Sequence, residues 1–351
     1  MKTEHLLIIR FSALGDVAMA VPVVASLARQ YPHLRITMLS QPFARPLFEG
    51  LGDNVSFMEA DIRGENHGIK GLNALYRRLA AKHFTAVADF HNILRSNYLR
   101  MRFNIDRYHV AHIDKHRSLR RQLVRHGAAT AQPLPSSFQS YADVLARLGY
   151  PVTLDFTSVF PGGAAPLRQL PEAIGEKRAL QQWIGIAPFA AHTGKIYPTE
   201  RMEQVVAQLE RLHPSCRIFL FGAGDKEKAT LDAWTQRHRC ATSVPGTLSG
   251  LSQELALMSR LDVMVSMDSA NMHLAAIAGA RVVSIWGATH PKAGFLGWHQ
   301  REDDAVQTTL PCRPCSIFGQ KPCQRGDWAC LQQISPEQIV EKVERVLAEK
   351  R

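Results

Sequence analysis

The chain has 351 residues, of which 46% are hydrophobic and 21% are charged, a composition typical of a folded globular protein and unlike a disordered or fibrous one. Its length predicts two or three domains, and no apolar run approaches the roughly 18 residues of a membrane-spanning helix. Lysine and arginine exceed aspartate and glutamate by 42 to 31. Such a basic chain attracts polyanions: nucleic acid, an anionic membrane surface or a phosphorylated substrate.

The first 28 residues are mostly apolar, as in a signal peptide, but their details favour a different interpretation. The apolar core Leu6-Leu7-Ile8-Ile9 spans four residues before Arg10 and Asp16 interrupt it, whereas a signal-peptide core runs for roughly 7–15 residues. We therefore expect a buried first strand and a cytoplasmic protein, in which the cysteines would not form a disulfide framework.

Strands and helices are predicted to alternate along the first half. Strands are expected at 5–9, 35–40, 86–90 and 107–113, and helices at 17–31, 72–82 and 97–102. Strands separated by helices form a parallel sheet that is covered on both faces. The first half is therefore predicted to be an α/β unit.

A Pro/Gly-rich stretch at 160–166 predicts a linker, after which the alternation restarts. Strands are expected at 183–188, 217–221, 263–267 and 282–286, and helices at 199–212, 227–237, 251–259 and 270–278, with a last helix from Pro336 to about 348. Ser335 is a suitable N-cap for that helix. Two doubly wound units would present a cleft at the carboxyl ends of their strands.

The strongest candidate site follows the predicted strand 263–267. The chain there reads Asp268-Ser269-Ala270-Asn271-Met272-His273 and then enters a helix with small residues. The free N–H groups of a helix N-terminus favour a phosphate, and Asp268 is placed to accept hydrogen bonds from sugar hydroxyls. The alternative is that Asp268 and Ser269 merely cap the helix.

Three further turns follow predicted strands. Gly222 lies in a Gly-Ala-Gly turn that lets a ligand approach the backbone. Lys195, in the sequence His192-Thr193-Gly194-Lys195, offers a cation for a phosphate. Asp16 follows Gly15 near a helix N-terminus, where it is either a general base or an N-cap.

Two clusters remain open to several interpretations. Cys312, Cys315, Cys323 and Cys330 lie within nineteen residues; their spacing is compatible with structural zinc, a labile disulfide or free thiols. The run 115–125 is the densest in basic residues. It is either a solvated helix face or a surface that binds a phosphorylated or membrane-borne acceptor through Lys115, Arg117, Arg120 and Arg121.

Together these motifs resemble glycosyltransferase family 9, the ADP-heptose:lipopolysaccharide heptosyltransferases. The resemblance covers nearly the whole chain and rests on the stretches 9–22, 88–96, 268–279 and 286–291, and on the cysteine cluster with the Ile334-Ser335-Pro336-Glu337 that follows it. It implies a GT-B fold, in which two Rossmann-like domains face a central cleft. The implied parts are an acceptor-binding domain (1–160), a linker (161–180), a nucleotide-sugar-binding domain (181–334) and a C-terminal helix (335–351) that packs back towards the N-terminal domain.

The resemblance also implies the reaction and the roles of individual residues. Heptose is transferred with inversion from ADP-heptose to the lipid A-linked inner core of lipopolysaccharide, without a metal ion or cofactor, at the cytoplasmic face of the inner membrane. Asp16 matches the catalytic base and Lys195 the lysine near the donor phosphates. The donor-binding residues implied by the same matches are Thr193, Gly222, Glu227 (ribose), Ser249 (adenine), Asp268 (sugar hydroxyls), Ser269, Ala270, Asn271 and His273.

The chain departs from the family pattern at Ser269-Ala270, where many members have Thr-Gly, and this leaves the sugar and the acceptor open. A GT-B transferase for another nucleotide sugar is the alternative within the enzyme class. A basic, zinc-bearing nucleic-acid-binding protein is the alternative from another class, but no nucleic-acid-binding motif is present, and we predict no nucleic-acid partner. A non-catalytic nucleotide-sugar sensor is disfavoured by the joint presence of Asp16, Lys195 and Asp268.

Overall fold

The computed structural model describes residues 4–129 and 131–349. The chain divides into two compact units, each described here by itself. Unit 1 comprises Met1–Lys115 and Pro135–Val159, and unit 2 comprises His116–Leu134 and Phe160–Arg351. The segment 116–134 was expected in the N-terminal domain; its contacts group it with unit 2 instead.

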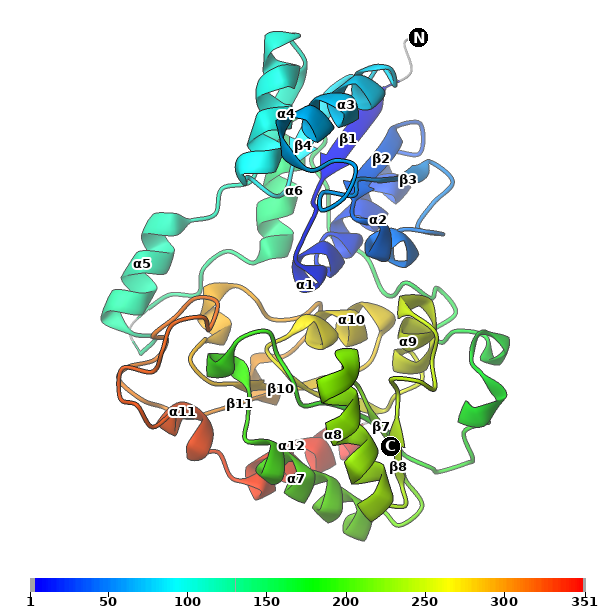
Figure 1. Cartoon of the computed structure of the whole chain (residues 1–351), viewed down its shortest axis with the longest axis vertical. Helices are drawn as coiled ribbons and strands as arrows, with labels where there is room; N and C mark the ends of the chain where they lie inside the picture. The colour runs from blue at the N-terminus through cyan, green and yellow to red at the C-terminus, as the bar shows by residue number, and fades with distance from the viewer. Residues whose placement is uncertain (1–3, 130, 350–351) are drawn as a thin grey trace. The chain divides into compact units, whose positions relative to one another are not determined.

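Unit 1 contains a five-stranded parallel sheet in its described residues, with the order β3-β2-β1-β4-β5. Figure 1 labels the first four of these strands, β1 to β4. The strands are β1 His5–Ile9, β2 Arg35–Ser40, β3 Val55–Glu59, β4 Ala86–Asp89 and β5 His109–His112. β1 is fully buried, as its apolar sequence predicts for a central parallel strand. The order reverses between β1 and β4, so this is the point where loops leave the sheet in opposite directions.

Helices cover both faces of this sheet. The helices of unit 1 are α1 Leu14–Ala18, α2 Val21–Gln30, α3 Gly68–Ala80, α4 Leu94–Ile105 and α6 Ser137–Arg147. Leu75 and Leu79 of α3 and Phe103 of α4 pack in one cluster with Leu7 and Ile9 of β1. Helix α6 begins after Ser136, whose hydroxyl accepts a hydrogen bond from the backbone N–H of Gln139 at 3.1 Å.

Unit 2 contains a six-stranded parallel sheet in its described part, with the order β11-β10-β9-β6-β7-β8. The strands are β6 Trp183–Ala187, β7 Arg217–Leu220, β8 Ala241–Ser243, β9 Val263–Met267, β10 Val282–Trp286 and β11 Ala305–Gln307. Here the order reverses between β6 and β9. The carboxyl ends of these two strands are therefore the expected place for a ligand in this unit.

The helices of unit 2 are α5 Arg117–His126, α7 Thr199–Leu212, α8 Gly224–Arg237, α9 Leu251–Met258, α10 Ala270–Ala278, α11 Ala329–Gln332 and α12 Pro336–Glu349. The buried residues Ile339, Val343 and Val346 of helix α12 join α7 and the strands in the core of unit 2. The physical reason is its apolar stripe at a spacing of three to four residues, which this sheet face buries. The expected packing of this helix back towards the N-terminal domain stays a prediction.

Short 3₁₀ turns complete the structure: η1 Pro42–Leu47, η2 Leu167–Gln169, η3 Glu172–Ile174, η4 Thr193–Lys195, η5 Pro291–Ala293 and η6 Glu302–Asp304. The predicted α/β class with two Rossmann-like units is confirmed. The predicted helix 17–31 is interrupted, since α1 ends at Ala18 and α2 starts at Val21. No helix in the described parts of the chain is long and apolar enough to cross a membrane.

Candidate functional site

The reversal point of unit 1 holds Asp16, the predicted catalytic base. Asp16 lies in α1, in the loop-helix segment that follows β1. It is not the N-cap, because Ala13 occupies that position. The Asp16 carboxylate forms an ion pair with Arg10 at 2.6 Å, far shorter than its 3.4 Å contact with the backbone N–H of Ala13. Asp16 is therefore not the N-cap residue, although its carboxylate still takes part in capping α1 by accepting from the N–H of Ala13.

Arg10 is the buried partner that fixes the position of Asp16. Its side chain is 8% exposed, against 32% for Asp16, and it also donates to the backbone oxygen of Phe90 at 2.7 Å. Burial alone would lower the pKa of Arg10, but the charge of Asp16, with Tyr141, raises it above its ordinary value. Tyr141 also donates to the backbone oxygen of Asp16 at 3.1 Å. The Asp16 carboxylate thus stays partly exposed, while Arg10 and Tyr141 hold the residue in position.

His91, which follows β4, lies against the same loop. The backbone N–H of Phe11 donates to His91 Nδ1 at 3.3 Å, so the ring proton is placed on Nε2. Burial, and then the charges of Arg10 and Lys115, lower the pKa of His91 to about 3. His91 is therefore a neutral ring at physiological pH. Its own turn is organised by buried Asp89, which accepts from the His91 N–H at 2.9 Å.

The reversal point of unit 2 brings together three of the residues that follow neighbouring strands. Lys195 ends η4 after β6, Asp268 follows β9, and Thr289 follows β10. Lys195 Nζ lies 2.8 Å from Asp268 Oδ2, and the Thr289 hydroxyl donates to the same oxygen at 2.8 Å. The two charged side chains are 15% and 4% exposed. This cluster is a buried ion pair at the position where a doubly wound sheet binds its ligand.

The turn after Asp268 leads directly into α10. Ser269 is the N-cap residue in an extended conformation and makes no side-chain cap hydrogen bond. Its hydroxyl lies 3.3 Å from that of Ser266. Ser269 thus occupies the N-cap position without a side-chain cap, and Asp268 bonds to Lys195 and Thr289 instead of capping the helix. The first-turn residues Ala270 and Asn271 are half-buried, and His273 is buried one turn further along.

The other predicted donor residues lie on the loops after β7 and β8 and on η4. Glu227 Oε2 accepts the backbone N–H of Ala223 at 2.8 Å, so this carboxylate closes the N-terminus of its own helix α8. A Cβ at Gly222 would lie 3.0 Å from Leu231 Cδ1 and 3.2 Å from that oxygen, so a larger residue would fit tightly here. Ser249 is exposed in the turn before α9, where its N–H donates to Gln253 at 2.6 Å. Thr193 is exposed and begins η4.

The predicted basic acceptor surface divides between the two units. Lys115 belongs to unit 1, whereas α5, with Arg117, Arg120 and Arg121, belongs to unit 2. The Arg120 guanidinium lies over the rings of Phe295 (5.0 Å) and Phe318 (5.7 Å), an internal packing role. Arg117 and Arg121 are exposed on the helix. Of these basic residues, Arg120 thus packs on aromatic rings, whereas Arg117 and Arg121 face solvent.

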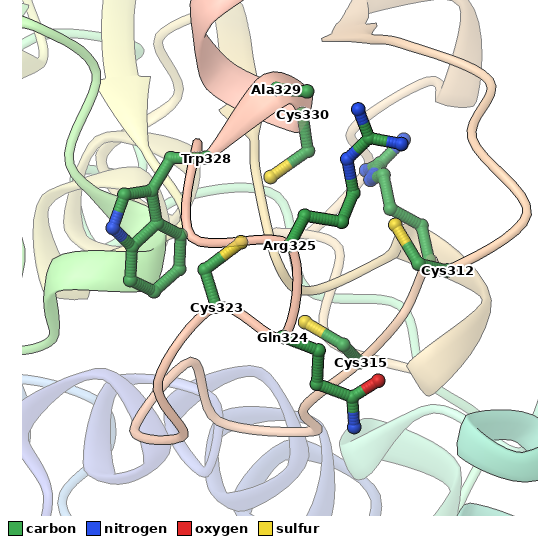
Figure 2. Close-up of a pocket in the computed structure, with 9 residues that line it drawn as sticks. Cys312, Cys315, Cys323, Gln324, Arg325, Trp328, Ala329 and Cys330 are labelled. Carbon is green, nitrogen blue, oxygen red and sulfur yellow. The ribbon is translucent and has the colours of Figure 1, made fainter.

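The four clustered cysteines surround one small space. Cys312, Cys315, Cys323 and Cys330 line a cavity of about 10 Å³ together with Arg325 and Trp328 (Figure 2). All four are free thiols. Burial raises the pKa of Cys330 to about 11. Among residues 4–129 and 131–349, no group of three or more His, Cys, Asp or Glu side chains is arranged to hold a metal ion.

Sequence reasoning missed several residues that build the site. Arg10 figured only as a charge that ends an apolar run, and Thr289 only as part of a family stretch. Arg313 lies between Cys312 and Cys315 and was not singled out, but it is 3% exposed and contacts the loop that carries Thr289. The sequence offered one signal for these missed site residues: Arg10 is a basic residue that directly follows a buried strand.

Comparisons with known proteins agree on one family. The family model described as glycosyltransferase family 9 (heptosyltransferase) matches residues 72–323. The chain is 25% identical to a lipooligosaccharide heptosyltransferase 2 of Campylobacter jejuni, over 47% of this chain and 50% of that protein. The chain thus spans about half the length of this relative. It is 23% identical to the lipopolysaccharide core heptosyltransferase OpsX of Haemophilus influenzae, over 82% of this chain and 80% of that protein.

A solved structure shows the same fold over the whole chain. The E. coli heptosyltransferase WaaC, with ADP-2-deoxy-2-fluoro heptose, superposes with a TM-score of 0.66 at 16% identity. The match covers 99% of this chain and 100% of that one.

Proposed function

The chain belongs to glycosyltransferase family 9, and from this membership we propose that it transfers heptose from ADP-heptose to the phosphorylated inner core of lipopolysaccharide. The transfer inverts the anomeric carbon and needs no metal ion or cofactor. The names of the Campylobacter and Haemophilus relatives support the acceptor class. The WaaC structure with a fluorinated ADP-heptose supports the donor.

The observation that carries this proposal is the Lys195–Asp268–Thr289 cluster at the strand reversal of unit 2. A departing ADP leaves with growing negative charge on its diphosphate, and preorganised cations and N–H groups stabilise that charge. Lys195 supplies the cation, and the first turn of α10, a helix of nine residues, supplies free N–H groups. Together they take the place of a divalent ion, and Asp268 takes a sugar hydroxyl once Lys195 turns to the phosphate.

Asp16 acts as the general base in this proposal. Direct displacement requires removal of the proton from the acceptor hydroxyl as the new glycosidic bond forms. The ion pair with Arg10 supports this role, because it orients an ionised carboxylate on a half-exposed loop. His91 is neutral, and a ring with Nε2–H is placed to donate a hydrogen bond.

The acceptor is proposed to bind through the basic residues of the run 115–125. Lys115, Arg117 and Arg121 attract the phosphates of the inner core, and Arg120 supports α5 through its aromatic contacts. Work at the anionic cytoplasmic leaflet would add about 1 kcal/mol of attraction for each nearby cation. Residues 181–334 bind the nucleotide sugar: Thr193, Gly222, Glu227 and Ser249 line the nucleoside side, and Ser269, Ala270, Asn271 and His273 the diphosphate side.

Purified protein offered ADP-heptose, another ADP-sugar, a UDP-sugar and a DNA oligomer tests this function. We expect binding of the ADP-sugars alone, and transfer to deacylated inner core that persists in excess EDTA. Asp16→Asn should retain ADP binding and lose roughly 10²–10⁴-fold in kcat, while the exposed control Asp53→Asn keeps wild-type kcat. Preference for the UDP-sugar, or a near-normal kcat for Asp16→Asn, would contradict the proposal.

A further inference from the structure

The segment 310–319, called here the bracing segment, packs directly on the Lys195–Asp268–Thr289 cluster. Its centre is Arg313, a residue that is 3% exposed. The Arg313 guanidinium donates to the backbone oxygens of Gly287 (2.6 Å), Thr289 (2.9 Å) and Trp286 (3.2 Å). It also donates to Thr308 and Gln307 on the neighbouring strand end. One side chain thus holds the loop 286–289 at the carboxyl end of β10, called here the β10 exit.

The β10 exit in turn fixes both charged residues of the cluster. The Thr289 hydroxyl donates to Asp268 Oδ2. The Ala288 N–H donates to the backbone oxygen of Gly194, the residue immediately before Lys195, at 2.8 Å. The Ala288 oxygen accepts from the N–H groups of Cys315 (3.1 Å) and Ser316 (3.3 Å) of the bracing segment. Arg313 is therefore linked to Asp268, and to the residue before Lys195, through two successive hydrogen bonds each, the first to the loop after β10 and the second from that loop.

The bracing segment also contacts the Lys195 side chain itself. A Cβ added to Gly319 would lie 2.7 Å from Lys195 Cγ, closer than real side chains approach one another. Gly319 has φ = +78°, and its N–H is held by the Ser316 hydroxyl at 3.0 Å. The aliphatic stem of Lys195 therefore lies flat on this glycine, which limits the directions in which Nζ can point.

Only arginine can make the contacts that Arg313 makes. A guanidinium has five donors in a planar fork, whereas an ammonium is a compact charge on a flexible stem. Burial lowers the pKa of Arg313 to about 10, so the group is still charged at neutral pH. A buried cation is costly, and the carbonyl oxygens of the β10 exit compensate it by hydrogen bonding. This arrangement ties the cation to that loop.

We propose that the bracing segment, anchored by Arg313, positions Lys195 and Asp268 for the donor diphosphate. Arg313 is thus a positioning residue rather than a catalytic one. The inference rests on the proposed function for its effect on transfer, but the orientation of Lys195 is measurable without any donor.

The first experiment compares Arg313→Lys with Arg325→Lys. Arg325 lies in the same region of the chain, but it is exposed and pairs with Asp327, so its replacement is a matched control. Tryptophan fluorescence verifies that each variant is folded. We expect Arg313→Lys to lower kcat/KM for the ADP-sugar about 10–100-fold, the size of effect that a small misplacement of a reacting group produces, and Arg325→Lys to leave it unchanged.

The second readout is the acetylation rate of Lys195 by acetic anhydride, followed by mass spectrometry of its peptide. In the wild type, the contact with Asp268 protects this amine. Arg313→Lys should increase its acetylation several-fold relative to that of the exposed Lys226, which serves as the internal reference. If the wild type fails to transfer from any ADP-sugar, the proposed function is wrong, while this measurement still tests the positioning.

Gly319→Ala provides a variant that removes no buried charge. Its methyl group should displace Lys195, increase acetylation and reduce kcat/KM about tenfold. In a Lys195→Met background the same substitution should have little further effect on kcat/KM, whereas a general loss of structure would reduce both backgrounds equally. The inference is overturned if Gly319→Ala leaves Lys195 acetylation at the wild-type level, or if folded Arg313→Lys does so.

Discussion

Replacement of Lys195 by methionine isolates the energetic role of the buried ion pair. The two charges lie 2.8 Å apart, and at an effective dielectric constant of 20 their attraction is about 6 kcal/mol before desolvation is subtracted. Lys195→Met leaves Asp268, which is 4% exposed, as an uncompensated charge. Removal of one partner from a buried pair costs about 3–5 kcal/mol. We expect a loss of about 3 kcal/mol, because the Thr289 hydroxyl still donates to Asp268.

The assay uses the distribution of tryptophan in the chain. The five tryptophans are Trp183, Trp234, Trp286, Trp298 and Trp328, all in unit 2. Tryptophan fluorescence during urea titration therefore follows unit 2 alone. A loss of about 3 kcal/mol, with a slope of about 2–3 kcal/mol per molar urea, moves the midpoint down by about 1 M.

Two further variants decide whether the reasoning holds. Lys228→Met breaks an exposed i,i+4 pair with Asp232 on α8 and should leave the midpoint unchanged. The double variant Lys195→Met/Asp268→Asn should recover part of the loss, because the asparagine carries no charge and still accepts from Thr289. A midpoint for Lys195→Met equal to that of Lys228→Met would refute the buried-pair interpretation.

The pKa of His91 is about 3 in the folded chain and 6.5 in its ordinary state, so below pH 6.5 the unfolded chain takes up a proton that the folded chain does not. Hydrogen exchange of β1 and β4 peptides should therefore show unit 1 losing up to about 1.4 kcal/mol per pH unit between pH 6 and 4 and no such loss above pH 7, and His91→Gln should flatten this slope. Arg117→Ala/Arg121→Ala should raise the acceptor KM at low salt and leave the KM for the ADP-sugar unchanged. If this variant and the wild type have equal acceptor KM values at both 50 and 300 mM salt, α5 is ordinary surface. Arg120→Ala should instead lower the urea midpoint of unit 2 through its lost aromatic contacts, and an unchanged midpoint would contradict that packing role.

The sequence predicted the central strands well, because their burial is written in uninterrupted apolar runs. β1, β2, β9 and β10 begin and end where the patterns placed them. β3, β8 and β11 were not predicted: they are edge strands, where half-exposed residues such as those of β3 remove the apolar signal. The basic helix α5 was noticed for its charge, but nothing local indicates that its contacts are with unit 2.

Site residues were predictable where a loop follows a strand and carries an unusual side chain, as at Asp16, Lys195 and Asp268. Their partners were not. Arg313 lies 45 residues after Asp268 in a segment whose cysteines dominate its appearance. Its role depends on backbone oxygens, which every residue has and no sequence pattern displays.

The two reversal points carry opposite arrangements of charge, and this contrast is the best reason to connect them with one reaction. In unit 1 a buried arginine holds a half-exposed carboxylate, so the group presented outward is a proton acceptor. In unit 2 a buried aspartate holds an ammonium, so the group available to a ligand is a cation. An inverting sugar transfer needs one of each: a base for the acceptor hydroxyl and a positive site for the departing diphosphate. A nucleotide sensor would need the second arrangement alone and would have no use for the outward carboxylate that Arg10 holds in unit 1.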